Sequence, residues 1–364
     1  MRMSTEEAAR LAAASAPISV KHLDADDRAA VARWEAFVDA CPEATFFHKA
    51  GWQQIIDQVF GHRTYFLYAE RAGVVEGVLP LAQVNSVLFG NSLVGLPFAV
   101  YGGVAATSAA AAAALELEAQ ALASRLDVGH LELRNVCQRH PEWPTQDLYV
   151  RFRKAIAPEV EANLLAIPRK QRAMVRKGIK NGLRSEIDAD AGRFFALYAD
   201  NVHRHGTPAF SRRYFEALLQ VFAADCEVLT VVDGATGSGR PLSSVLSFYF
   251  RDEVLPYYAG DEVSARELAA NDFKYWELMR RSCERGLKVF DYGRSKQGTG
   301  SFAFKKNWGF EPQPLFYEYC LYRRDSIPQN NPSNAKYRLL IETWRRLPIG
   351  VANWLGPLIV RHLG

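Results

Sequence analysis

The fold is decided by one stretch, Glu227-Val-Leu-Thr-Val-Val-Asp-Gly-Ala-Thr-Gly-Ser-Gly-Arg-Pro-Leu-Ser-Ser-Val-Leu-Ser-Phe-Tyr-Phe250. Its two runs of β-branched and aromatic residues, 227–232 and 242–250, flank a glycine-rich turn and predict two strands joined as a hairpin. A helical pattern at about 212–222 precedes the hairpin. A strand at 254–260 and a helix at about 268–285 follow it. The stretch therefore predicts the centre of an α+β unit.

The first half of the chain follows the same plan. A helix at about 52–59 precedes strands at 65–69 and 74–84, which are separated by a turn at Gly73. The repeated order predicts a duplicated α+β unit of roughly 140 residues. We expect four segments: a first lobe at 17–160, a basic connector helix at 161–184, a second lobe at 185–325 and a tail at 326–364.

Size and composition bound the class of protein. The chain has 364 residues, of which 49% are hydrophobic and 23% charged, so we expect a well-cored protein of two domains. A net charge of only +4 predicts no DNA partner and leaves polyanion binding to local clusters. The five cysteines show no metal-ligand spacing, so we expect reduced thiols and no metal. Neither a signal peptide nor a span of ~20 apolar residues is evident, which predicts a cytoplasmic protein.

The connector carries the strongest charge feature. Residues 162–185 include seven Lys or Arg residues and no acidic residue. Pro168 suits the first turn of a helix and Gly182 suits its end. On a 3.6-residue period one stripe is formed by Arg169, Arg172, Arg176 and Lys180. A ligand bearing phosphates would neutralise this stripe, and the alternative is a solvated helix between domains.

A second motif, Ser295-Lys-Gln-Gly-Thr-Gly-Ser-Phe-Ala-Phe-Lys-Lys-Asn-Trp-Gly-Phe310, follows a predicted strand at 287–293. The glycines at Gly298 and Gly300 would allow backbone amides to approach an anion. Lys305, beside Phe304, would place a positive charge where an acyl oxygen becomes negative. The alternative is a glycine-rich hairpin followed by surface lysines.

With these features in view, the chain resembles the FemABX-type aminoacyltransferases, a branch of the GNAT-like acyltransferase superfamily built from two GNAT-type lobes. The likeness covers residues 17–323. Its pieces are 46–52, 77–81, 96–103, 131–135, 168–182, 206–208, 257–260, 290–295 and 304–309, the last matching a Phe-Lys-Lys-x-aromatic-Gly element. The elements Tyr101-Gly-Gly103, Gly293-Arg-Ser-Lys296 and Trp344-Arg-Arg-Leu-Pro348 are most similar to FemAB-like proteins associated with exosortase (PEP-CTERM) and exopolysaccharide gene clusters.

The resemblance implies an α+β fold of two tandem GNAT-like lobes, and it implies roles for particular residues. Lys305 would lie at the transfer centre with Phe304 beside it. Arg172 or Arg176 would contact the diphosphate of the acceptor, and Tyr257 or Tyr258 would line its groove. Further substrate-binding candidates are Trp52, His48, Tyr101, Arg294, Gly298 and Gly300. For His48 the alternative is a packed histidine, and for Tyr101-Gly-Gly103 it is a tight turn.

The implied activity is amide formation on an amine of a cell-envelope or exopolysaccharide precursor, with no bound cofactor. The acyl donor would be aminoacyl-tRNA or an acyl thioester of CoA or a carrier protein. Two departures bear on the substrates. Gln53 and Gln54 follow Trp52 where the muropeptide branch often has a lysine. Ser295, three positions before Gly298, stands where the pyrophosphate loop of acetyl-CoA-dependent enzymes has Gln or Arg. The first alternative is an N-acyltransferase that depends on acyl-CoA or an acyl carrier protein. The second alternative is a non-catalytic adaptor at an envelope-export complex.

The tail adds an expectation about location. Residues 336–364 contain short apolar runs with Trp344 and Trp354 among arginines, a composition typical of interfacial membrane elements. Pro348 and Pro357 would break the tail into short segments. We expect peripheral contact with the inner membrane surface, and the alternative is a tail that packs on the body of the protein.

Overall fold

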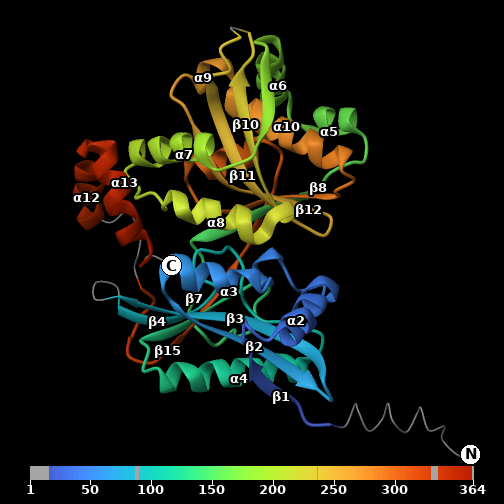
Figure 1. Ribbon diagram of the computed structural model, residues 1–364, viewed down its shortest axis with the longest axis vertical. Helices are drawn as coiled ribbons and strands as arrows, with labels where there is room; N and C mark the ends of the chain where they lie inside the picture. The colour runs from blue at the N-terminus through green and yellow to red at the C-terminus, as the bar shows by residue number, and fades with distance from the viewer. Residues whose placement is uncertain (1–15, 87–89, 236, 329–334, 363–364) are drawn as a thin grey trace, which may run out of the picture. The chain divides into compact units, whose positions relative to one another are not determined.

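The computed structural model describes residues 16–86, 90–235, 237–328 and 335–362 (Figure 1). The chain forms two compact units. The first unit contains residues up to 146 together with 315–328, and the second unit contains 147–314 together with 329–363.

The first unit is an α+β structure. Its elements are β1 (Ser19–His22), α2 (Arg28–Ala40), η1 (Phe46–His48), α3 (Gly51–Ile55), η2 (Ile56–Phe60), β2 (Arg63–Arg71), β3 (Val74–Ser86), β4 (Gly90–Gly95), β5 (Ala105–Ala106), α4 (Ala109–Arg125), β6 (His130–Asn135), β7 (Thr145–Gln146) and β15 (Phe316–Leu321). Helix α4 covers one face of the sheet, and α2 packs on the other face (Figure 1).

The second unit has the same kind of structure. Its elements are β8 (Tyr149–Ala155), α5 (Val160–Ala166), α6 (Arg169–Lys180), β9 (Leu183–Asp188), α7 (Gly192–Arg204), α8 (Arg212–Phe222), η3 (Ala223–Asp225), β10 (Cys226–Asp233), β11 (Pro241–Phe250), β12 (Glu253–Asp261), α9 (Ala265–Leu268), α10 (Ala270–Glu284), β13 (Val289–Lys296), α11 (Gly300–Asn307), β14 (Pro312–Pro314), α12 (Ala335–Arg346) and α13 (Ile349–Val360). Helices α7 and α8 lie on one face of the sheet and α10 on the other.

The two sheets have matching strand orders, which confirms the predicted duplication. The first sheet runs β1-β2-β3-β4-β6-β15-β7, with β5 beside β3, and the second runs β9-β10-β11-β12-β13-β8-β14. Each sheet contains one parallel pair at the same place in this order, β4 with β6 and β12 with β13. The hairpin that decides the fold is β10 and β11, and its register runs from Cys226↔Phe248 to Val232↔Pro241.

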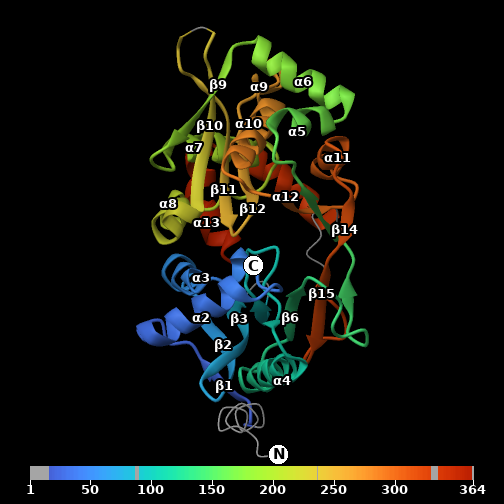
Figure 2. The same cartoon turned by 90° about the vertical axis from the view of Figure 1, so that its right-hand side faces the viewer.

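The lobe boundaries differ from those expected from the sequence. Strand β8 lies before the expected boundary at 160, yet it pairs with β13 in the second sheet. Strand β15 lies within the expected second lobe at 185–325, yet it pairs with β6 in the first sheet (Figure 2). Each sheet thus contains a strand that the sequence assigned to the other lobe. Local patterns cannot show this exchange, because strand partners are set by contacts far apart in the chain.

Helix α6 matches the predicted basic helix, but it is part of the second unit and not a free connector. It begins after Pro168 and ends before Gly182, which has a φ of +69°. Val175 and Gly178 are its buried residues. At Gly178 a Cβ would lie 2.8 Å from Cβ of Phe273, so the glycine permits close packing on α10. The basic side chains consequently lie on the exposed face of a helix that packs on α10.

The described part of the tail forms two helices that pack on α7. Pro348 precedes α13, as the sequence predicts for a break. Pro357, however, lies inside α13 and does not divide it, because the helix continues through neighbouring turns despite the missing N–H donor. Across the residues that the structure describes, no helix has both the length and the apolar character needed to cross a membrane.

Candidate functional site

The second sheet opens at its parallel pair. Strands β12 and β13 pair at two positions, Glu253↔Val289 and Val254↔Phe290. Beyond these positions the described residues of the two strands no longer pair with each other. β12 carries a register shift at Tyr257, and β13 carries one between Asp291 and Arg294. Where two strands diverge, their backbone donors and acceptors no longer bond to each other and can instead bond to other groups of the protein, to water or to a ligand. The divergence is therefore a candidate binding site.

The corresponding place in the first sheet is occupied by the chain itself. Strands β4 and β6 pair at three positions, from Ser92↔His130 to Val94↔Glu132. Beyond them, the N–H of Gly103 donates to the carbonyl oxygen of Arg134 at 3.0 Å. A Cβ on Gly95 would lie 2.4 Å from the carbonyl oxygen of Gly102, so the backbones of β4 and this loop are in close contact. The loop 96–103 thus fills the divergence of the first sheet, and the second sheet offers the better candidate.

Lys305 lies at the end of β13. It extends from the last turn of α11, where Thr299 caps the helix by accepting from the N–H of Phe302. The Nζ atom donates to the carbonyl oxygens of Tyr292 at 2.7 Å and of Arg294 at 2.9 Å. These are the residues at the register shift of β13, so Lys305 holds the distorted segment in place.

The charge state of Lys305 differs from the sequence expectation. The sequence analysis treated Lys305 as a permanent positive charge at the transfer centre. Burial lowers the pKa of Lys305 to about 7, while the Asp291 carboxylate raises it and Arg294 lowers it. The side chain as a whole is only half-buried, but its ammonium group is enclosed by the chain, and desolvation acts on that group. Lys305 therefore titrates near neutral pH.

An aromatic cluster surrounds the Lys305 segment, and its polar members were missed by the sequence analysis. Phe304 is half-buried, with its ring centroid 5.4 Å from that of Tyr275 and 5.9 Å from that of Trp308. The Nε1–H of Trp308 donates to Asp272 at 3.0 Å, and burial raises the pKa of Asp272. The hydroxyl of Tyr292 is buried and has no hydrogen-bond partner among the described residues. No local motif links Asp272, Tyr275 and Tyr292, because they come together only through the packing of α10, β13 and α11.

Arg294, Gly298 and Gly300 lie near Lys305 in sequence but play different parts. The guanidinium of Arg294 lies over the ring of Tyr149, 4.7 Å from its centroid. Gly298 has a φ of +75°, which favours glycine, whereas Gly300 is the first residue of α11. A Cβ on either glycine would meet no atom within 4 Å. Neither glycine is required by close contact with another part of the chain.

Of the two candidate tyrosines on β12, Tyr258 has a side chain that packs within the second unit. Its hydroxyl lies 3.0 Å from the hydroxyl of Tyr214, and its ring contacts those of Tyr198, Phe210 and Phe215. Burial raises the pKa of Tyr258 well above its ordinary value. Tyr257 stands at the register shift and its ring contacts Phe248, with the centroids 5.3 Å apart. Tyr257 is therefore the better placed of the two beside the divergence.

The three candidates in the first unit are core residues, which corrects their assignment to substrate binding. Trp52 is fully buried, and its Nε1–H donates to the carbonyl oxygen of Phe46. Both ring nitrogens of His48 have partners, Nδ1 at Thr45 and Nε2 at the carbonyl oxygen of Gly103, 2.9 Å away. Tyr101 is 2% exposed and packs edge-on against Phe47. Burial against their own unit leaves these side chains no surface for a ligand, and the packed-histidine alternative holds.

The basic stripe of α6 is accessible. Arg176 is exposed, and Arg172 is half-buried with its Nη1 donating to the carbonyl oxygen of Leu165 at 2.9 Å. Lys177 is also exposed but points about 100° away from Arg176 around the helix. The structure thus leaves the Arg176 side of α6 open to an anionic ligand.

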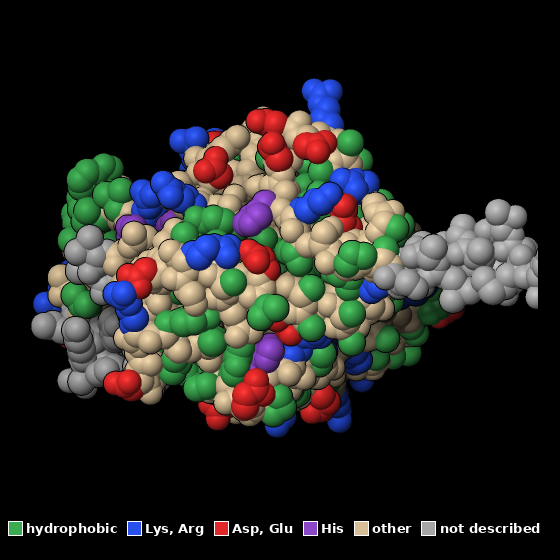
Figure 3. Space-filling model, turned by 90° about the horizontal axis from the view of Figure 1, so that it is seen from below, with side chains coloured by type: hydrophobic (Ala, Val, Ile, Leu, Met, Phe, Trp, Pro, Cys, Tyr) green, Lys and Arg blue, Asp and Glu red, His purple; other side chains and the backbone are tan. Residues whose placement is uncertain are grey.

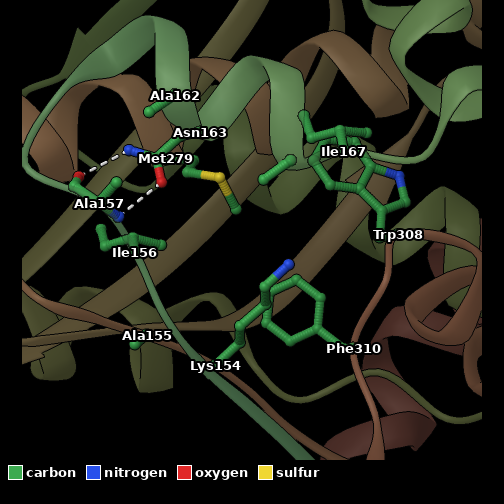
Figure 4. A pocket seen from close by; sticks show the side chains of 11 residues that line it. Lys154, Ala155, Ile156, Ala157, Ala162, Asn163, Ile167, Met279, Trp308 and Phe310 are labelled. Atoms are coloured by element: carbon green, nitrogen blue, oxygen red, sulfur yellow. Dashed lines mark hydrogen bonds between the residues drawn. The ribbon is translucent and has the colours of Figure 1, made fainter.

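A cavity of about 150 Å³ lies beside the end of the 295–310 motif (Figure 4). Its walls are mainly apolar and come from β8, α5, α10 and the segment after α11, with Met279, Ile167, Trp308 and Phe310 among them. Lys154 points into the cavity, and its Nζ lies 5.7 Å from the centroid of the Phe310 ring. Neither Lys305 nor Phe304 lines it. The cavity is thus separate from the transfer site that the sequence suggested.

Comparison with known proteins places this site in a recognised domain. Residues 169–306 match the family described as "Acetyltransferase (GNAT) domain". The matched segment runs from α6 into α11, so it contains the diverging strands and Lys305. Over these residues the second unit is thus similar to a GNAT-type acetyltransferase domain. Searching the curated proteins gives no significant match.

Solved structures of low sequence identity share the fold over most of the chain. The crystal structure of FemX has a TM-score of 0.64 at 15% identity, covering 84% of this chain and 98% of that one. The structure of L-PGS from Bacillus licheniformis has a TM-score of 0.51 at 10% identity, covering 90% and 99%. A tandem GNAT protein from the clavulanic acid biosynthesis pathway, in a structure without AcCoA, has a TM-score of 0.50 at 14% identity, covering 85% and 100%. The fold is therefore a tandem pair of GNAT-like units, as the sequence predicts.

Proposed function

We propose that the chain is an acyltransferase or aminoacyltransferase that forms an amide on an amine of a cell-envelope or exopolysaccharide precursor. The observation that supports the proposal is that the GNAT-domain match contains the point where β12 and β13 diverge. The equivalent place in the first unit is filled by residues 96–103, so we assign the transfer site to the second unit.

The chemistry requires a neutral amine, an aligned ester or thioester, and a stabilised oxyanion. Where β12 and β13 separate, the extended, amide-bearing part of a donor could lie between them as an added strand. Holding the reacting groups in line can supply roughly 7–11 kcal/mol in the best cases. In the proposed mechanism Lys305 fixes the end of β13 and supplies positive charge to the transfer centre, with Phe304 packed beside it.

Two donor classes fit this proposal. The tandem fold shared with FemX favours aminoacyl-tRNA, and the acetyltransferase domain match favours an acyl thioester of CoA or a carrier protein. The acceptor we propose carries phosphate groups near its amine, because α6 presents exposed arginines. The link to exosortase-associated systems rests on the motif resemblance alone and stays part of the proposal.

The donor is tested by adding each candidate separately to the full-length protein. We expect one of acetyl-CoA, an acyl carrier protein thioester or an aminoacyl-tRNA to raise the unfolding temperature and to support amide formation with an amine acceptor. Free CoA and deacylated tRNA are the controls for binding without transfer. A protein that neither binds nor turns over any of these donors would favour the adaptor alternative.

The role of the α6 stripe is tested by charge removal. We expect Arg172→Ala and Arg176→Ala each to weaken binding of a diphosphate-linked sugar, such as UDP-N-acetylglucosamine, by roughly tenfold, because a charge-assisted bond to phosphate is lost. The loss should shrink as salt rises. Lys177→Ala removes the same charge from another side of α6 and is the matched control. Equal binding by all three variants at low and high salt would leave α6 a solvated helix.

A further inference from the structure

Helix α13 has two faces of different character. Its buried residues are small or β-branched: Ala352, Gly356 and Val360. On the other side Val351, Trp354 and Leu358 are 41%, 70% and 51% exposed. Their spacing of three and four residues puts these three side chains on one stripe, named here the α13 face. Large apolar side chains are often exposed singly, but a stripe on one helix marks an interaction surface.

The α13 face is held outward by contacts on the opposite side of the helix. A Cβ on Gly356 would lie 2.8 Å from the carbonyl oxygen of Ala209, so α13 is seated closely on the second unit. Helix α12 is fixed beside it, since Nε2 of His203 lies 3.1 Å from the carbonyl oxygen of Trp344 and Arg345 donates to the carbonyl oxygen of His205. Turning the α13 face inward would break these contacts. The tail therefore packs on the body with one side and leaves an apolar surface on the other.

The charges around the α13 face indicate its partner. Within 335–362 the sequence has five basic residues and one acidic residue, Glu342. Arg345 and Arg346 are exposed at the end of α12, and two residues separate α12 from the start of α13. Figure 3 shows hydrophobic side chains projecting at the left-hand edge of the molecule, the side where α12 and α13 lie in Figure 1. An apolar stripe beside exposed arginines complements an anionic phospholipid surface, whose headgroups attract the cations while Trp and Leu enter the interface.

We propose that α13 docks the protein on the surface of an anionic phospholipid bilayer, with Val351, Trp354 and Leu358 inserted and Arg345 and Arg346 at the headgroups. At twelve residues the helix is too short to span, so it lies in the plane of the interface. This docking is independent of the transfer chemistry. Acyl transfer by protein that does not bind vesicles would contradict only the docking, and vesicle binding without transfer would contradict only the proposed function.

The test is co-sedimentation of the full-length protein with sucrose-loaded vesicles. We expect binding to vesicles of phosphatidylcholine and phosphatidylglycerol to exceed binding to phosphatidylcholine alone, and the excess to fall as salt rises. The double change Trp354→Asp and Leu358→Asp should lower the partition coefficient at least about tenfold. Leu117→Asp is the matched control, because Leu117 is 69% exposed on α4 in the first unit. It should bind as the wild type does.

A charge-reversal arm checks the arginines. Arg345→Glu with Arg346→Glu should reduce binding to anionic vesicles several-fold and leave the weak binding to neutral vesicles unchanged. Circular dichroism and thermal melting establish that each variant is folded. Wild-type binding by the folded Trp354→Asp, Leu358→Asp variant, or no vesicle binding by the wild type, overturns the proposal. So does a wild-type dimer that this variant converts to a monomer, because a second copy would then cover the α13 face.

Discussion

Lys305→Ala lowers the rate of acyl transfer at least about a hundredfold, the scale for removing one charged group at a developing oxyanion. The second unit should stay folded. The variant loses the bonds from Nζ to the carbonyl oxygens of Tyr292 and Arg294, which should reduce the free energy of unfolding by about 1–3 kcal/mol. Turnover and urea denaturation measured on the same preparation separate the two effects. Lys306→Ala, at the exposed neighbouring lysine, is the matched control. Near-normal turnover by folded Lys305→Ala protein would remove Lys305 from the mechanism.

The pH dependence tests whether the ammonium form of Lys305 is the active one. Its pKa is about 7, so the charge is lost as the pH rises through this value. The transfer rate should therefore fall on the alkaline limb of the pH–rate profile. Asp291 raises the pKa of Lys305, and its carboxylate accepts from the N–H of Gly293 at 2.7 Å. Asp291→Asn keeps an oxygen for that N–H but removes the charge, so the falling limb should move to lower pH. A limb that stays in place would assign the titration to another group.

The same pKa has a consequence for stability. The folded pKa of about 7 lies below the ordinary value of 10.5, so between these values the unfolded chain binds more protons than the folded one. The free energy of unfolding should therefore rise with pH across this window. Below about pH 7 Lys305 is charged in both states, and burying that charge lowers the free energy of unfolding by its full amount. Lys305→Met should abolish this rise when urea denaturation is followed from pH 7 to pH 10.

Trp308→Ala reduces the free energy of unfolding of the second unit by about 3–5 kcal/mol, the range for deleting a large buried aromatic side chain. Trp308 is 1% exposed and packs against Phe304 and Tyr275. Trp354→Ala is the control, because that tryptophan is 70% exposed and its loss should change stability by no more than about 0.5 kcal/mol. Similar losses in the two variants would mean that Trp308 is not a core residue.

Trp308→Phe isolates the hydrogen bond to Asp272. It retains most of the ring but leaves the buried carboxylate without its indole donor, which should cost about 1–3 kcal/mol. Burial already raises the pKa of Asp272, and the bond from Trp308 opposes that rise. The variant should therefore raise the pKa further. When the pKa of a carboxyl group is raised by folding, the folded state loses stability as the pH rises through that pKa. The loss of unfolding free energy in Trp308→Phe, relative to the wild type, should therefore be larger at pH 7 than at pH 4.

The sequence by itself determined the elements of the fold and their duplication. The hairpin at 227–250, the basic helix between Pro168 and Gly182, and the matching order in the first half all follow from local signals. Alternation of side chains, glycine at turns and proline at a helix start act within a few residues, so they can be recognised without the folded structure. The proline inside α13 is the exception, since packing on α7 retains a helix that local propensity would interrupt.

Only the tertiary structure decided which strands complete each sheet and which candidate side chains reach a surface. Strands β8 and β15 each join the sheet of the lobe other than the one expected from the sequence, and Trp52, His48 and Tyr101 become core residues of the first unit. Lys305 was identified in sequence as a charge at a motif, but the folded chain encloses its amine among carbonyl oxygens and thereby lowers its pKa. Burial and desolvation depend on every neighbour in space, most of them distant in sequence, and no local pattern specifies them.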